Sequence, residues 1–146
     1  MPGPPPPASP TPTASPTPTA TPTATPGTIV VGTKTFSSKA VTVKVFNGTS
    51  SSQVLTGLSI TWPQGTNGNL TKITFNGTTI YNTSTGGGSL TIPPPPLGGT
   101  TAQRTIATNT CGTLVFTFAS NVSTNPALYN TSSATFSPYG TVTWQP

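Results

Sequence analysis

The chain has 146 residues, with five Lys and Arg but no Asp, Glu or His, which gives a formal net charge of +5. His, Asp and Glu supply most proton-transfer groups in enzymes and, together with Cys, most metal ligands, so this composition excludes hydrolytic and metal-dependent catalysis and predicts no cofactor. Charged residues make up 3% of the chain, against about a quarter in ordinary soluble domains, so Thr, Ser, Asn and Gly supply the polar surface.

The sparse charge also limits the partners. The basic residues are Lys34, Lys39, Lys44, Lys72 and Arg104. They form no cluster in the sequence, so we expect no nucleic-acid binding. No run of about 18 apolar residues exists, so we expect no membrane insertion. An uncharged polar surface favours contact with copies of the same chain or with glycan, and we expect an extracellular or cell-surface protein whose secretion signal lies outside these residues.

Residues 1–27 are predicted to form an extended arm. Eleven of the 19 prolines lie in the first 26 positions, among Thr, Ala and Ser, which favours a polyproline II conformation reaching about 80 Å. One interpretation is a linker with O-linked glycans, and the other is an ordered arm that lies on a neighbouring subunit. The candidate O-glycosylation sites are Thr11, Thr13, Thr17, Thr19, Thr21, Thr23 and Thr25.

Residues 28–146 are predicted to form one immunoglobulin-like antiparallel β-sandwich of about eight strands, without helices. Short runs that alternate apolar and polar residues are separated by Gly, Asn, Ser and Pro, as half-buried strands require. In chain order the runs are Ile29–Val31, Ala40–Phe46, Leu58–Trp62, Thr71–Phe75, Ser89–Ile92, Gln103–Ala107, Thr113–Ala119, the less regular Ala127–Phe136, and Gly140–Trp144. The four prolines at 93–96 cannot donate to a β-ladder and are predicted to lie in a loop or along an edge.

The segment from Leu58 to Asn82 carries the clearest local prediction. Asn76-Gly77 follows an alternating run, and Asn and Gly are the residue types that supply at least cost the positive φ that a type I′ hairpin turn requires at both central positions. The same alternation identifies the apolar face of each strand. The predicted core residues are Val41, Val43, Val45, Leu58, Ile60, Ile73, Phe75, Leu114, Phe116 and Phe118.

A single cysteine, Cys111, precedes the apolar run Thr113–Ala119. An internal disulfide is impossible, so two interpretations stay open. The thiol is half-buried as a small apolar group, or it forms an intermolecular disulfide.

Two sets of residues are candidates for contact with carbohydrate. Six asparagines stand in Asn-x-Ser/Thr motifs, which arise either by chance in a chain of this composition or as N-glycosylation sites. They are Asn47, Asn69, Asn76, Asn82, Asn121 and Asn130. Five aromatic residues could stack on sugar rings, with Gln64, Asn67 and Arg104 assisting, unless Trp62 and Trp144 cap the core. They are Trp62, Tyr81, Tyr129, Tyr139 and Trp144.

The runs SITWPQGTNGNLTKITFNGTTIYN and QRTIATNTCGTLVFTF resemble a type of module found in secreted bacterial proteins. The resemblance covers about residues 28 to 136. It implies an immunoglobulin or fibronectin-like sandwich on a Pro/Thr linker, as carried by surface, adhesive and polysaccharide-degrading proteins. No residue of a functional motif transfers, and the chain lacks a sortase-type LPxTG tail.

Three hypotheses for function follow. The first is a non-catalytic structural or adhesive subunit that assembles with copies of itself into a surface filament, with exposed strand edges and the arm contacting neighbours. The second is a carbohydrate-binding module of a polysaccharide-degrading system. The third is an inert spacer domain.

Overall fold

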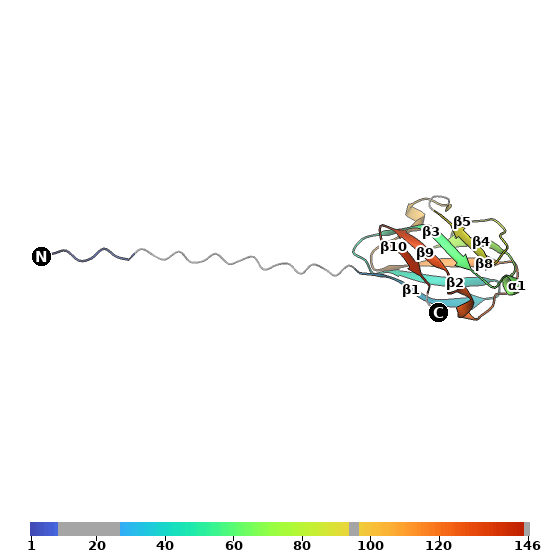
Figure 1. Ribbon diagram of the computed structural model, residues 1–146. Coiled ribbons are helices and arrows are strands. Elements are labelled where there is room, and N and C mark those ends of the chain that lie inside the picture. The colour runs from blue at the N-terminus through green and yellow to red at the C-terminus, as the bar shows by residue number, and fades with distance from the viewer. Residues whose placement is uncertain (9–26, 94–96, 145–146) are drawn as a thin grey trace.

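The alternating runs form two antiparallel β-sheets in the computed structural model, which describes residues 1–8, 27–93 and 97–144 (Figure 1). The first sheet contains, in spatial order, β1 (Ile29–Ser37), β2 (Ala40–Asn47), β8 (Thr110–Phe118), β4 (Leu70–Phe75) and β5 (Thr78–Tyr81). The second contains β10 (Gly140–Thr143), β9 (Ser133–Ser137), β3 (Gln53–Thr61) and β6 (Ser89–Ile92), and β7 (Thr105–Ile106) also pairs with β3. The chain is therefore all-β, as predicted.

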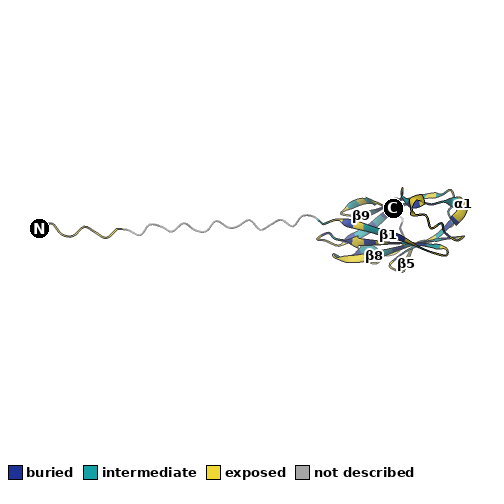
Figure 2. Cartoon of the chain, turned by 90° about the horizontal axis from the view of Figure 1, so that it is seen from below, coloured by how far each residue is buried: buried dark blue, intermediate teal, exposed yellow. Residues whose placement is uncertain are grey.

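One apolar core joins the two sheets, and all ten predicted core residues belong to it. Each of the ten exposes 3% of its surface or less. Ring contacts cross between the sheets, because Trp62 follows β3 and packs on Phe118 of β8, while Trp144 follows β10 and packs on Phe116 of β8. Figure 2 shows the sheets from below, with β9 on one side and β8 and β5 on the other. Two sheets around a shared core are consistent with a β-sandwich.

The predicted Asn-Gly hairpin is confirmed. Phe75 pairs with Thr78 across the turn, and the φ angles of Asn76 and Gly77 are 49° and 83°. Both values lie in the left-handed region that a type I′ turn requires. The turn is further held by the backbone N–H of Thr113, which donates to Oδ1 of Asn76 at 2.8 Å.

The first strand of this hairpin, β4, and the strand before it in the chain, β3, lie in different sheets. β3 is in the second sheet and β4 is in the first. The short helix α1 (Gln64–Asn67) connects them, and the left-handed Gly68, with φ 69°, ends it. The chain thus crosses from one sheet to the other within a few residues, and its apolar side chains enter the core from both sides.

Several predicted boundaries are wrong. The structure has ten strands in the described residues, not about eight, and three short helical turns where no helix was predicted. The predicted strand 103–107 is instead the 3₁₀ turn η1 (Ala102–Arg104) followed by β7, and the irregular run 127–136 is η2 (Pro126–Tyr129) followed by β9. Short pieces of this kind are poorly marked in sequence, because a three-residue turn has no period. Most of the arm predicted over residues 1–27, and Pro94 to Pro96, lie outside the described residues.

A β-bulge in β1 changes which residues face inward. The pairing of β1 with β2 shifts between Val31 and Lys34. An extra residue in one strand reverses the alternation beyond it, so Lys34 points toward the interior and only 7% of its surface is exposed.

Candidate functional site

Trp62 and Trp144 are core residues. Trp62 exposes 3% of its surface and Trp144 exposes 1%. The Trp62 indole Nε1 donates to the carbonyl oxygen of Gly68 at 3.0 Å and to Oε1 of Gln64 at 3.2 Å. Rings covered in this way present no face to a sugar, so the prediction of glycan stacking at the two tryptophans is wrong, and the alternative, that they cap the core, holds.

Tyr129 is also removed from the set of stacking candidates, because it is fully buried against Phe36. Its hydroxyl accepts from Nδ2 of Asn67 at 2.8 Å and donates to the carbonyl of Ser123 at 2.9 Å. The Ser123 amide in turn donates to Oδ1 of Asn67 at 2.9 Å. Burial raises the pKa of Tyr129 above 10.0, although the hydrogen bond from Asn67 opposes the shift. This closed network fastens the segment before β9 to α1 and satisfies every buried polar atom that it uses.

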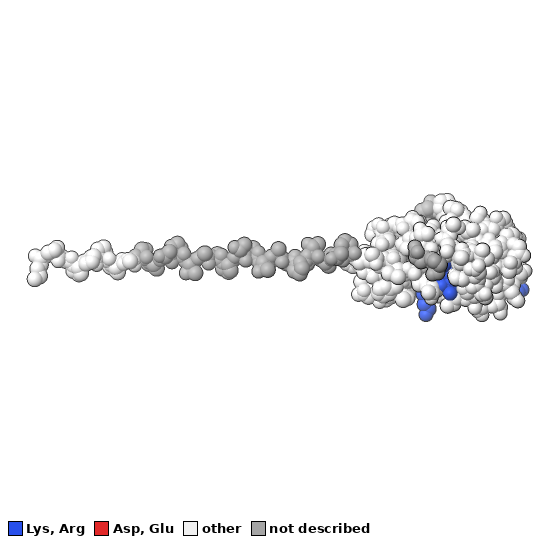
Figure 3. All heavy atoms as spheres, turned by 60° about the horizontal axis from the view of Figure 1, so that its bottom comes forward, with Lys and Arg blue, Asp and Glu red and all other residues white. Residues whose placement is uncertain are grey.

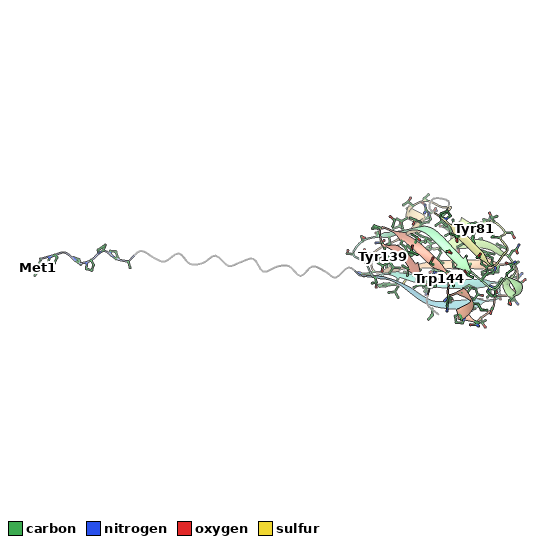
Figure 4. The ribbon with its side chains drawn as sticks, viewed as in Figure 1. Met1, Tyr81, Tyr139 and Trp144 are labelled. Carbon is green, nitrogen blue, oxygen red and sulfur yellow. The ribbon has the colours of Figure 1, made fainter. Side chains whose placement is uncertain are left out.

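The two remaining aromatic candidates do not form a platform together. Tyr139 is 40% exposed, and Tyr81 is half-buried with its hydroxyl bonded to Thr85. Figure 4 shows Tyr81 and Tyr139 well apart on the domain. The structure therefore leaves two isolated tyrosines from the five predicted residues, and Gln64, Asn67 and Arg104 are engaged in bonds within the fold.

An exposed apolar row that the sequence did not single out crosses three strands of the first sheet. Val30 of β1 pairs with Phe46 of β2, and Phe46 pairs with Cys111 of β8. Val30 is 52% exposed and Phe46 is 38% exposed. Cys111 is exposed as well, so the interpretation of a half-buried thiol is wrong, and an intermolecular disulfide stays a prediction.

The asparagine motifs divide by burial. Asn47 is fully buried, and its Nδ2 atom donates to the carbonyls of Ser51 and Ile106, both at 2.9 Å. This is the atom that an N-linked glycan would occupy, so the prediction of a glycan at Asn47 is wrong for the folded protein. Asn76, Asn82 and Asn121 are exposed, and Asn69 and Asn130 are half-buried. The seven candidate threonines of the arm lie outside the described residues.

Basic side chains occupy different environments. Lys39, Lys44 and Lys72 are exposed, whereas Arg104 is half-buried and its Nη1 donates to the Leu55 carbonyl at 2.7 Å. Lys34 is buried, and desolvation lowers its pKa from the ordinary 10.5. On the face drawn in Figure 3 the basic atoms are few and separate.

The edge strands of the two sheets differ in their protection. β1 has a bulge and an inward-pointing lysine, two features that discourage pairing with another chain. At β5 the amide of Gly98 donates to the carbonyl of Ile80 at 2.8 Å and so covers the edge. β6 and β10 are the opposite edges of the second sheet. Within the described residues, neither of these two strands contains a charge, a proline or a shift of register.

Within the described ranges, no helix has the length and hydrophobicity to cross a membrane. The same ranges contain no group of three His, Cys, Asp or Glu side chains that could hold a metal ion. No family model, curated protein or solved structure matches the chain.

Proposed function

We propose that the protein is a non-catalytic extracellular structural or adhesive subunit that assembles with copies of itself into a filament. The observation that carries the proposal is the pair of four-residue edge strands β6 and β10, which lie on opposite sides of one sheet and contain no charge, proline or register shift. An edge strand offers a row of unpaired N–H and C=O groups to any second chain.

The direction of these groups follows from the hydrogen bonds next to each strand. The amide of Trp144 donates to the carbonyl of Ser132 at 2.9 Å, and the amide of Trp62 donates to the carbonyl of Gly88 at 2.9 Å. Antiparallel ladders alternate between bonded and non-bonded pairs. The backbone groups of Thr143 in β10 and Thr91 in β6 therefore point away from their partner strands, toward the free edge.

Pairing of β6 of one copy with β10 of the next would be a head-to-tail contact. Such a contact uses two different surfaces of the molecule and leaves one of each free at the ends, so it generates an open filament unless the rotation closes a ring. The surface supports this arrangement, because copies with a net charge of +5 on 146 residues and few exposed ions repel one another weakly. The predicted Pro/Thr arm would add a second contact between neighbours.

Proline at the outward-pointing positions tests the proposal. Thr143→Pro and Thr91→Pro each remove one free-edge donor without touching the existing ladder. Sedimentation velocity over a range of concentrations and electron microscopy should show long assemblies for the native chain and only short ones for either proline variant.

Thr143→Ala and Thr91→Ala are the matched controls, because they remove the same side chains but keep the N–H groups. They should assemble as the native chain does, and circular dichroism should show that all four variants are folded. A native chain that stays monomeric at every concentration, or folded proline variants that assemble normally, would refute the proposal.

A further inference from the structure

The outer face of the first sheet carries two of the three exposed lysines of the described residues. Lys44 on β2 pairs with Thr113 of β8, and Lys72 on β4 pairs with Thr117 of β8. Both lysines are exposed. Lys44 lies between the buried Val43 and Val45, and Lys72 precedes the buried Ile73, so both point outward. Lys39 is exposed in the turn that leads into β2.

The spacing of the lysines follows from the pairing. Thr113 and Thr117 are four residues apart on β8, and the two lysines lie on opposite sides of that strand. The Cα atoms of Lys44 and Lys72 are therefore about 17 Å apart. Lys39 precedes Ala40, which pairs with Thr117 as Lys72 does, so Lys39 and Lys72 lie at the same end of the face. The cross-strand partners of the two lysines, Thr113 and Thr117, carry hydroxyl groups that can donate and accept hydrogen bonds, and the apolar Val115 lies between them on the same face of β8.

No acidic side chain neutralises this face, because the chain contains no Asp or Glu. The other two basic residues do not contribute to it, since Lys34 points inward and Arg104 binds β3 of the second sheet. Charge complementarity therefore favours an anionic partner whose negative charges are spread over a distance similar to the separation of Lys44 and Lys72.

An apolar surface adjoins the charges. Phe46 is two residues from Lys44 on the same face of β2, and Val30 is its cross-strand neighbour. An acidic polysaccharide carries carboxylates together with apolar C–H faces along one flexible chain, so it matches a surface that combines ammonium, hydroxyl and ring groups. A nucleic-acid duplex presents chiefly phosphates at its surface, which arginine binds better than lysine does, and no arginine lies among the described residues of this face.

We propose that the outer face of the first sheet, formed by Lys44, Lys72 and Phe46 with Lys39 in the adjoining turn, binds an acidic polysaccharide of the uronic-acid class. The proposal goes beyond self-assembly and does not depend on it, because the strand edges β6 and β10 belong to the other sheet.

Binding of the full chain to immobilised polygalacturonate tests the proposal, with Cys111→Ser in every variant so that no disulfide forms. We expect binding that disappears as NaCl is raised from about 10 mM to about 1 M, and no binding to neutral dextran. The double substitution Lys44→Gln and Lys72→Gln should weaken binding about tenfold. Phe46→Thr should weaken it severalfold through the loss of apolar contact.

A charge-matched control separates the face from the net charge. Ser52→Lys and Thr124→Lys, added to the double glutamine variant, restore the formal charge of +5 at exposed positions that precede β3 and follow β8. This variant should bind as weakly as the double variant.

Four outcomes would overturn the proposal: no binding of polygalacturonate, recovery of binding in the charge-matched variant, or equally tight binding of duplex DNA or of polyglutamate. Assembly is read separately by sedimentation, and these substitutions leave β6 and β10 unchanged.

Discussion

The Nζ atom of Lys34 donates a hydrogen bond to Oδ1 of Asn130 at 3.3 Å, across 96 positions of the chain. Lys34 belongs to β1 of the first sheet, and Asn130 follows η2 and precedes β9 of the second. The contact thus links the two sheets on the side where β1 lies near β10 (Figure 1). It exists because the bulge in β1 turns Lys34 inward.

Replacement of Lys34 by Met should raise the free energy of unfolding at pH 7 by about 1 kcal/mol, because burial of a charged group costs more than its bonds return. Burial lowers the pKa of Lys34 below 10.5, so between the folded and unfolded pKa values the unfolded chain binds more protons. The free energy of unfolding of the native chain therefore rises with pH in that window. Below the window Lys34 is charged in both states, and the full cost of burying that charge is present. Urea unfolding between about pH 8 and pH 10 should show this rise reduced in Lys34→Met.

Lys72→Met serves as the control for this measurement, because Lys72 is exposed. It should leave the free energy of unfolding at pH 7 within about 0.5 kcal/mol of the native value.

Above about pH 10 the raised pKa of Tyr129 makes the free energy of unfolding fall as pH rises, since the folded chain then holds a proton that the unfolded chain has lost. A Lys34→Met variant that is less stable than the native chain at every pH would show that the bond to Asn130 outweighs the desolvation.

Stability should be almost independent of pH on the acid side. No side chain of this composition titrates between about pH 2 and pH 7.5, and linkage requires a group whose pKa differs between the folded and unfolded states. Thermal midpoints measured at several pH values from about 3 to 7 should agree within about two degrees. A steep fall toward pH 3 would contradict this expectation.

Asn47 should be among the most sensitive polar positions. Its amide donates to the carbonyls of Ser51 and Ile106, and its Oδ1 accepts from the amide and the hydroxyl of Thr49 at 3.0 and 2.7 Å. Asn47→Ala leaves several buried groups without a partner and should lower the free energy of unfolding by about 3 kcal/mol. Asn121→Ala, at an exposed asparagine, should change it by less than about 0.5 kcal/mol in the same urea titration.

The hairpin turn offers a paired test of backbone conformation. Gly77 has φ 83°, and a Cβ atom added there would meet no other atom within 4 Å, so Gly77→Ala introduces strain without a clash. It should cost about 1–2 kcal/mol. Gly65 in α1 also has open space around it but no positive φ, so Gly65→Ala should be neutral or stabilise the fold by up to about 1 kcal/mol. Equal effects of the two substitutions on the thermal midpoint would contradict the turn assignment.

Local features could be predicted from the sequence. Asn and Gly favour the positive φ that a type I′ turn requires, so the hairpin turn at Asn76-Gly77 could be predicted from two residues. Val41, Val43 and Val45 alternate without interruption, so the buried face of β2 could be predicted from its own sequence. The sequence left open whether Trp62 caps the core or faces outward, because its burial depends on Phe118, a residue far along the chain that packs on its ring.

The surface was harder to predict than the core. The inward position of Lys34 depends on a bulge that no residue type marks, and the alignment of Lys44 and Lys72 across β8 depends on strand order. Phe46 lies outside the core alternation of Val41, Val43 and Val45, but its place in an exposed row with Val30 and Cys111 depends on the register of β1, β2 and β8. The candidate surfaces therefore arise from register and topology, which a single sequence specifies only weakly.

The place of β8 between β2 and β4 has a consequence for how the chain folds. Its partners come from two earlier parts of the chain, so the first sheet cannot close until Thr110–Phe118 has entered it. Pairings of such long range slow folding to milliseconds or seconds. During that interval β2 and β4 expose inner edges that the native protein covers, so newly made chains at high concentration face a kinetic competition between insertion of their own β8 and pairing with a neighbour.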